Sequence, residues 1–340
     1  MNAPRWEDLA TRARGLATHL LDRSAIASLT AVETVEALGD ALRGYGYPLP
    51  EGGVTADDLE LAVRRQAGSR LRVLARWAGN RSVLLAVIFE DEDRRSIRAI
   101  VRGAVQGAPA DLRLAGLIPT PALPERALRE LAMQPSPGAV AVLLTAWGNA
   151  YGTALLREAK ATQPDLLAIE SCLNVTFAQR ALDGARATGS GLVLDYVRDT
   201  IDLENATVAL MLAAGETDSP GKRAFVEGGR RLALGTFLEA IAAGDAGAAG
   251  RRLVTVFRPT PLAAAFERAA DASSIEEQLL RSRIAMIRDA ERRDPAGPAS
   301  VLGFALRVRA EVLDVRHAIW GIVLGAPRGS LAGAAVAAGV

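Results

Sequence analysis

One short pattern occurs three times in this chain at a constant spacing. Each copy begins with an acidic residue, and these residues are Asp93, Asp202 and Glu311. The first and second acids are 109 residues apart, and so are the second and third. Apolar residues stand four, seven and eight positions after each acid. A short pattern is common by itself, but three copies at one period indicate an internal repeat.

The spacing within each copy predicts a helix. Positions zero, three, four, seven and eight lie on one stripe of a helix with about 3.6 residues per turn. The acid can cap the first turn of that helix, where backbone N–H groups are free. It can instead reach a basic residue on a neighbouring repeat and fix the angle between the two. The sequence is compatible with both roles.

Other segments keep the same period. Helix starts are expected at Asp57, Leu166 and Ile275, which are again 109 residues apart. The third repeat is shorter than the others, and residues 1–56 resemble the half that it lacks. Three units that close around an axis would form a cup or funnel. The sequence therefore predicts a single domain of three pseudo-repeats, at about 57–165, 166–274, and 275–340 completed by 1–56.

Composition favours packed helices over sheets. Hydrophobic residues make up 50% of the chain, many of them Ala, whereas aromatic residues make up only 4%. Small side chains let helices approach closely, while β-sandwiches prefer β-branched and aromatic residues. We therefore predict an all-α fold.

Apolar spacing and breaker residues position the individual helices. Helices are expected over residues 5–23, 32–43, 59–77, 124–133, 140–159, 165–182, 231–241, 251–257, 262–270 and 278–292. The three motif copies would lie on further helices.

Charge and hydropathy exclude several classes of protein. Lys and Arg number 40 and Asp and Glu number 39, which gives a net charge of +1 and argues against a nucleic-acid-binding surface. A single cysteine, Cys172, cannot form an internal disulfide and fits a reducing compartment. The longest apolar runs, 82–89 and 139–147, fall short of the ~20 residues that span a bilayer. We expect a soluble protein that reaches any membrane through a partner.

No sequence pattern indicates catalysis. The two histidines, His19 and His317, have no second His or Cys at metal-ligand spacing. Segment 215–223 is close to a phosphate-binding loop, but Arg223 stands where Ser or Thr would bind Mg²⁺. Arginine pairs such as Arg64 and Arg65 are expected on solvated faces. We therefore expect no enzymatic activity, no cofactor and no metal.

At the repeated acidic motif, the chain resembles the C-type subunits of the V-type and A-type rotary ATPases, whose eukaryotic equivalents are the d-type subunits. That family carries an Asp-x-x-Asn-hydrophobic-basic motif in each of three internal repeats. The Asn is replaced in two of the present copies, and Met211 stands where a basic residue is usual. The matching positions are Asp202 with Asn205, Asp93 with Arg98, and Glu311 with Arg316.

The resemblance implies a non-catalytic, funnel-shaped subunit of the central stalk. Such a subunit would receive the tip of the central shaft, made of D-type and F-type subunits, and rest on the membrane rotor ring of proteolipid subunits. It would transmit torque during proton or sodium transport, as a peripheral protein on the cytoplasmic face of the membrane. The six matching residues would form structural contacts between the repeats.

Two other functions are compatible with the same sequence. A free-standing helical scaffold or regulator would use the small-residue helices to hold peptides in apolar grooves. A cofactor-independent enzyme would need an Asp/Arg site in the cup, and no residue spacing supports one.

Overall fold

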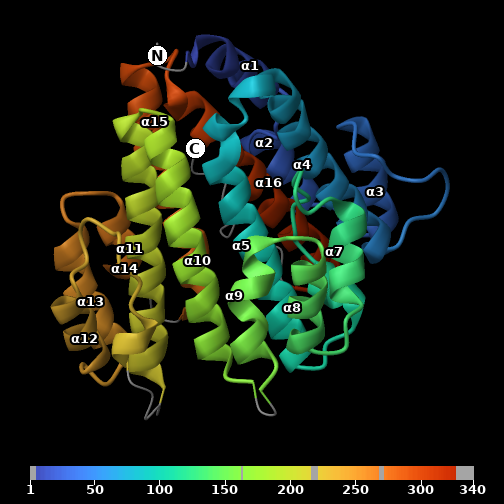
Figure 1. The fold of residues 1–340 in the computed structure, drawn as a ribbon. Coiled ribbons are helices and arrows are strands. Elements are labelled where there is room, and N and C mark those ends of the chain that lie inside the picture. Colours follow the sequence, from blue (N-terminus) through green and yellow to red (C-terminus); the bar gives the residue numbers. More distant parts are fainter. Residues whose placement is uncertain (1–4, 162–163, 216–220, 268–271, 327–340) are drawn as a thin grey trace.

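The computed structural model describes residues 5–161, 164–215, 221–267 and 272–326. These residues form sixteen α-helices and two short 3₁₀ helices, and the described ranges contain no strand (Figure 1). The predicted all-α class is therefore confirmed.

Six long helices form the body of the molecule. They follow one another in three consecutive pairs, and short breaks at residues such as Gly79 and Gly189 separate the two helices of a pair. The long helices are α4 (Ala56–Ala78), α5 (Val83–Val105), α10 (Leu166–Ala187), α11 (Gly191–Ala214), α15 (Ala272–Arg293) and α16 (Pro298–Val323).

Shorter helices lie around these pairs, and α2–α3, α7–α9 and α12–α14 form three separate groups (Figure 1). The shorter elements are α1 (Glu7–Ala17), α2 (Arg23–Thr30), α3 (Val35–Gly44), η1 (Gly79–Arg81), α6 (Ala110–Leu114), α7 (Glu125–Ala132), α8 (Pro137–Ala146), α9 (Ala150–Ala159), η2 (Gly221–Ala224), α12 (Leu234–Ile241), α13 (Ala246–Phe257) and α14 (Leu262–Glu267).

Long helices of different pairs pack directly against one another. Helix α5 lies against α10, α4 lies against α16, and α11 contacts α15. Helix α1 also packs on α16, so the first and last helices of the described chain lie side by side (Figure 1). Segments that are far apart in the sequence therefore meet at three joints.

The apolar core has two parts. The larger cluster takes side chains from α1–α11, α15 and α16. The smaller one gathers α12–α14 around the ends of α11 and α15. Alanines such as Ala181 and Ala185 are fully buried, and their small side chains let the helices come close together.

The predicted helix over 140–159 is wrong in one respect, because the structure contains two helices there, α8 and α9. Gly148 between them has a φ of 70°, a conformation that favours glycine. The Asn149 side chain then caps α9 by accepting a hydrogen bond from the Tyr151 N–H at 3.0 Å. The apolar spacing continues across this turn, which is why the sequence suggested one helix.

The predicted helix over 5–23 ends earlier, at Ala17, and the sequence pattern did not indicate α2. Asp22 caps α2 by accepting a hydrogen bond from the Ala25 N–H at 2.8 Å. The end of the predicted helix 262–270 and most of segment 215–223 lie outside the described residues.

Candidate functional site

The three motif acids lie inside long helices. Asp93 lies in α5, Asp202 in α11 and Glu311 in α16, each at least ten residues after the helix begins. The prediction that these acids cap the first turn is therefore wrong. Apolar residues that precede each acid already belong to the helix, and Ser190, not Asp202, caps α11.

Asp202 fastens a loop to α11. The carboxylate is fully buried and accepts hydrogen bonds from the backbone N–H groups of Arg230 and Arg231, both at 2.8 Å, and of Leu232 at 3.1 Å. Burial raises the pKa of the Asp202 carboxyl above its usual value, and the three N–H donors oppose that rise. A Cβ on Gly229 would lie 1.9 Å from the Asp202 Oδ1, so this approach requires glycine.

Asn205, one helical turn after Asp202, fastens the same loop at a second point. Its side-chain amide donates to the Val226 carbonyl at 2.8 Å and accepts from the Val226 N–H at 2.9 Å. The Asp-x-x-Asn spacing therefore places two backbone-binding groups on one face of α11.

Glu311 makes the corresponding contact at the other end of the sequence. Its carboxylate accepts hydrogen bonds from the Leu21 N–H at 2.7 Å and from the Tyr47 hydroxyl at 2.6 Å. It also forms a buried ion pair with Arg70 on α4. Among the described residues, Glu311 is the one of the three acids that bonds a basic side chain, whereas the partners of Asp202 are backbone N–H groups.

The Asp93 carboxylate binds its loop through the hydroxyl group of Thr120. It accepts a hydrogen bond from the Thr120 Oγ1 at 2.5 Å, and that hydroxyl accepts from the Leu123 N–H at 2.9 Å. Burial raises the pKa of the Asp93 carboxyl to about 7, the Thr120 hydroxyl opposes the rise, and the nearby Glu90 and Glu92 add to it.

The three acids share one geometry. Leu21, Leu123 and Leu232 each stand two residues before an eight-residue helix, respectively α2, α7 and α12. Their backbone N–H groups bond the motif acid directly or, for Leu123, through Thr120. Each acid therefore fixes the segment that precedes one of these eight-residue helices. The sequence did not indicate this partner.

The two motif arginines reach other long helices. Arg98 on α5 donates to Glu204 on α11 at 2.6 Å and to Asn174 on α10 at 2.6 Å. Desolvation raises the pKa of the partly buried Glu204 carboxyl, but Arg94 and Arg98 outweigh it and hold this pKa well below the usual value.

Arg316 on α16 donates to Glu60 on α4 at 2.8 Å, and the Trp320 indole donates to the same carboxylate at 2.7 Å. Within the described part of the chain, none of the six predicted residues bonds to another of the six. They form separate contacts and do not converge on a reactive centre.

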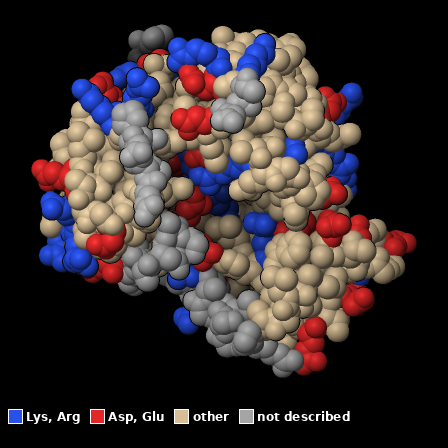
Figure 2. Space-filling view, turned by 90° about the horizontal axis from the view of Figure 1, so that it is seen from below, with Lys and Arg blue, Asp and Glu red and all other residues tan. Residues whose placement is uncertain are grey.

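The long helices enclose a central cavity, which we define by two adjoining pockets that share Arg95, Glu276, Arg309 and Leu313. The inner pocket has a volume of about 80 Å³ and the outer one about 440 Å³. Figure 2 shows the molecule hollowed at its centre, with basic side chains inside the hollow. The outer pocket is lined by six arginines, Arg95, Arg98, Arg102, Arg113, Arg309 and Arg316.

Carboxylates behind the cavity wall hold most of these arginines in place. Arg95 donates to Asp91 at 3.2 Å, Arg309 donates to Glu92 at 2.8 Å, and Arg102 donates to Glu170 at 2.7 Å. These ion pairs fix the direction of each guanidinium, and they leave N–H groups that face the cavity. The cavity is therefore a rigid, polar socket.

The described residues contain no group of three or more His, Cys, Asp or Glu side chains that could hold a metal ion. His317 pairs with Glu277 at 2.9 Å, and this hydrogen bond raises the pKa of the imidazole. Among the described helices, none has both the length and the hydrophobicity that a bilayer span requires.

Comparison with known protein families gives one result. A family model described as ATP synthase (C/AC39) subunit matches residues 9–331 of the chain. No curated protein matches the chain.

Proposed function

We propose a function from the premise that this chain belongs to the ATP synthase (C/AC39) subunit family. As a member of that family it is a non-catalytic component of a V/A-type ATPase and belongs to the central stalk that links to the rotor. What we propose is how its cavity, its motif residues and its helix order serve this role.

The central cavity receives the tip of the rotating shaft, formed by D-type and F-type subunits. The observation that carries this proposal is the polar socket between α5, α11, α15 and α16. A shaft can turn such a socket only if the wall does not yield, and packed helices with buried ion pairs provide that stiffness. The ring of proteolipid subunits binds elsewhere on the molecule, and through it the chain lies on the cytoplasmic face of the membrane.

The funnel consists of three related modules, at about 57–165, 166–274, and 275–340 completed by 1–56. The order of elements supports this division, because each module contains an eight-residue helix, α7, α12 or α2, that is followed by a longer one, α8, α13 or α3. The common geometry of the motif acids supports it as well, since each acid bonds the segment before that eight-residue helix.

Within this arrangement, the motif residues have two structural roles. Asp93, Asp202, Asn205 and Glu311 close the three modules by binding their own loops. The arginines join modules, because Arg98 reaches Glu204 of the second module and Arg316 reaches Glu60 of the first. Glu311 adds a joint of its own through Arg70.

A binding measurement with a cavity variant tests this function. The purified chain should bind the shaft complex of D-type and F-type subunits from the same operon, and it should also bind membranes that carry the rotor ring. Leu112 is 57% exposed and lines the outer pocket, so Leu112→Trp should weaken shaft binding at least tenfold by narrowing the entrance. A wild-type chain that bound neither shaft nor ring would contradict the proposal and favour a free-standing scaffold.

Val142 provides the matched control. This side chain is 47% exposed and lies on α8, away from the residues that line the cavity. Val142→Trp should leave shaft binding unchanged. If both tryptophan variants weakened binding equally, the effect would come from a general change in the surface and not from the cavity.

A further inference from the structure

Arg283 on α15 is a buried cation that no carboxylate of the described chain contacts. It is 8% exposed, and its Nη2 donates to the Thr200 hydroxyl at 2.7 Å. Its guanidinium carbon lies 4.5 Å from the centre of the Tyr196 ring. Every other arginine that lines the inner pocket forms an ion pair at 4.0 Å or less with an Asp or Glu. The buried Asp91 carboxylate acts on Arg283 electrostatically but forms no ion pair with it, and a buried charge without a direct ionic partner is costly.

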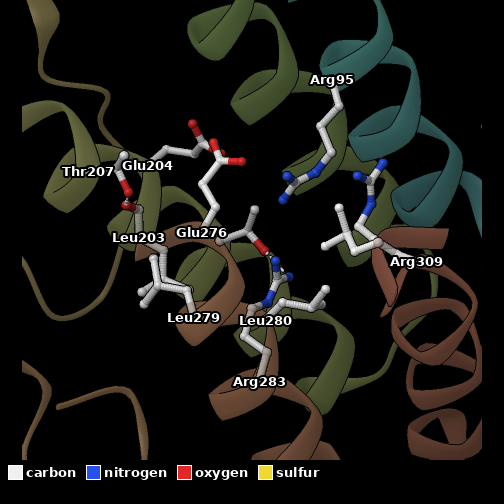
Figure 3. Close-up of a pocket in the computed structure, with 11 residues that line it drawn as sticks. Arg95, Leu203, Glu204, Thr207, Glu276, Leu279, Leu280, Arg283 and Arg309 are labelled. Atoms are coloured by element: carbon white, nitrogen blue, oxygen red, sulfur yellow. Dashed lines mark hydrogen bonds between the residues drawn. The ribbon is translucent and has the colours of Figure 1, made fainter. Parts of the chain in front are cut away.

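The side chain borders the inner pocket of the central cavity. Figure 3 shows the guanidinium groups of Arg95, Arg283 and Arg309 around one space, with the carboxylates of Glu204 and Glu276 on its other side. Glu204 already accepts hydrogen bonds from two arginines of α5. Glu276 is exposed and forms no ion pair among the described residues. The pocket therefore has more guanidinium donors than free carboxylate acceptors.

The inner pocket lies at the joint between α11 and α15. This joint differs from the joints between α4 and α16 and between α5 and α10. Glu60, Glu170 and Glu276 stand at the same position of α4, α10 and α15. The first two bind arginines of the facing helix, α16 and α5. At the third joint, Thr207 and Met211 of α11 occupy the positions that correspond to these arginines. No ion pair bridges α11 and α15 within their described residues, although the hydrogen bond from Arg283 to Thr200 joins the two helices.

We propose that the inner pocket binds a carboxylate on a protein segment that enters the cavity, with Arg283 as its principal partner. The proposal rests on the proposed function, because the shaft is the segment that enters. An arginine binds a carboxylate through two parallel N–H···O bonds. The volume of about 80 Å³ suits such a group. Four leucines supply the apolar part of the wall, as expected for contact with a side chain of a protein, and these are Leu203, Leu279, Leu280 and Leu313.

Arg283→Met tests the assignment through two measurements, the affinity for the shaft and the thermal midpoint of the free chain. Affinity for the purified shaft complex should fall at least tenfold, because the carboxylate loses its partner. The thermal midpoint of the free chain should stay the same or rise, because the substitution removes an unpaired buried charge. If Arg283 only holds Thr200 and Tyr196 in place, the midpoint should fall while shaft affinity is retained, and that result would overturn the proposal.

Two further variants make the result specific. Arg292→Met removes an exposed arginine of the same helix, which pairs with Asp289, and it should leave shaft affinity unchanged. Glu276→Gln should leave shaft affinity unchanged or increase it, because it removes the unpaired carboxylate that faces the pocket. A Glu276→Gln loss equal to that of Arg283→Met would mean that Glu276 itself is the partner of Arg283, and it would overturn the proposal.

Inorganic phosphate separates a protein carboxylate from a free anion. Wild type and Arg283→Met are compared in phosphate and in chloride of matched ionic strength. A phosphate-specific rise in the wild-type midpoint, with equal shaft binding by both proteins, would assign the pocket to a small anion and overturn the proposal. If wild type and Arg283→Met bound the shaft equally and phosphate had no effect, the assignment of the pocket would be overturned, but the proposed function would stand. If wild type did not bind the shaft, the proposed function itself would be contradicted.

Discussion

At the scale of single residues, the motif acids are hydrogen-bond acceptors for backbone N–H groups. Asp202 and Glu311 bind such groups directly, and Asp93 binds one through the Thr120 hydroxyl. A buried carboxylate of this kind is costly to remove, because the N–H donors lose their acceptor and water cannot replace it. The motif thus contributes to stability and not to chemistry.

Asp202→Ala should lower the free energy of unfolding by on the order of 3 kcal/mol, because three buried N–H groups lose their acceptor. Chemical denaturation of wild type and variant measures the change. Asp195→Ala is the matched control: its side chain is 46% exposed and pairs with Arg230, so the expected loss is ~0–1 kcal/mol. Equal effects of both substitutions would refute the role given to Asp202.

The pKa of Asp93 predicts a pH dependence of stability. Burial raises the pKa of this carboxyl from its ordinary value of 3.8 to about 7 in the folded protein, so between these limits the folded state holds a proton that the unfolded state releases. Stability contributed by this group is complete below pH 4 and is lost as the pH rises through 7. Asp93→Asn should remove this loss, which is on the order of 2–4 kcal/mol in wild type between pH 5 and 8.

Unfolding in urea at pH 5 and pH 8 measures the difference between the two proteins, so that other titrating groups cancel. The charged side chains that act on Asp93 in the folded chain are Glu90, Glu92 and Arg180, and they are present in both proteins. Asp183→Asn changes an exposed acid on α10 and should keep the wild-type pH dependence. The same slope in wild type and Asp93→Asn would show that Asp93 titrates normally.

The sequence revealed the motif residues but not their partners. Period and spacing identified Asp93, Asp202 and Glu311 because all three copies are in register. The partner loops carried a weaker signal: a leucine stands 30 residues after each of the first two acids, at Leu123 and Leu232. A backbone N–H has no sequence signature of its own, so only the fold shows that it faces the acid.

At the scale of elements, glycines determine how closely the loops approach the long helices. Gly228 has a φ of 110°, and Gly229 lies directly against the Asp202 carboxylate. Side chains at these two positions would force the segment before α12 away from α11. The Gly-Gly pair is therefore part of the same joint as the motif acid.

Gly229→Ala should destabilise the protein by about 2–3 kcal/mol, because its Cβ would displace the loop from the Asp202 Oδ1. Gly235→Ala is the opposite control. Gly235 lies in α12 with open space around its Cβ direction, so alanine should stabilise the helix by ~0.5–1 kcal/mol. Thermal unfolding of both variants checks the two signs, and stabilisation by both would contradict the close approach.

The joint between α11 and α15 should gain stability from an added cation. Met211 is 47% exposed and stands where Arg102 stands on α5, so Met211→Arg should pair with Glu276 and contribute ~0.2–1 kcal/mol. A double-mutant cycle with Glu276→Gln isolates this pair. A gain that persists in the Glu276→Gln background would mean that the two positions do not face each other.

Helices with strong apolar spacing were predictable from the sequence, and their turns were less so. Spacing identified segments such as 59–77 and 165–182, which the structure contains as parts of α4 and α10. It failed at 140–159, where the apolar stripe continues through the turn at Gly148. It also missed α2, whose capping residue Asp22 was assigned to the preceding helix.

At the scale of the whole molecule, the joints between long helices decide the shape of the cavity. The repeat period and the composition predicted the helices and their order, because both are properties of the sequence itself and do not depend on contacts between distant residues. The cavity depends on contacts such as Arg70 with Glu311 and Arg309 with Glu92, whose members are far apart in the chain. Such pairs cannot be chosen from one sequence that contains 40 basic and 39 acidic residues.

Site-specific crosslinking in the assembled ATPase tests most directly whether the cavity receives the shaft. In a Cys172→Ser background, Leu112→Cys places one thiol at the cavity entrance, and Val142→Cys places one on α8. After reaction with a maleimide–benzophenone reagent and irradiation, we expect the Leu112→Cys product to contain a shaft subunit and the Val142→Cys product to contain none. A shaft crosslink from Val142→Cys alone, or none from Leu112→Cys in the intact complex, would contradict this role of the cavity.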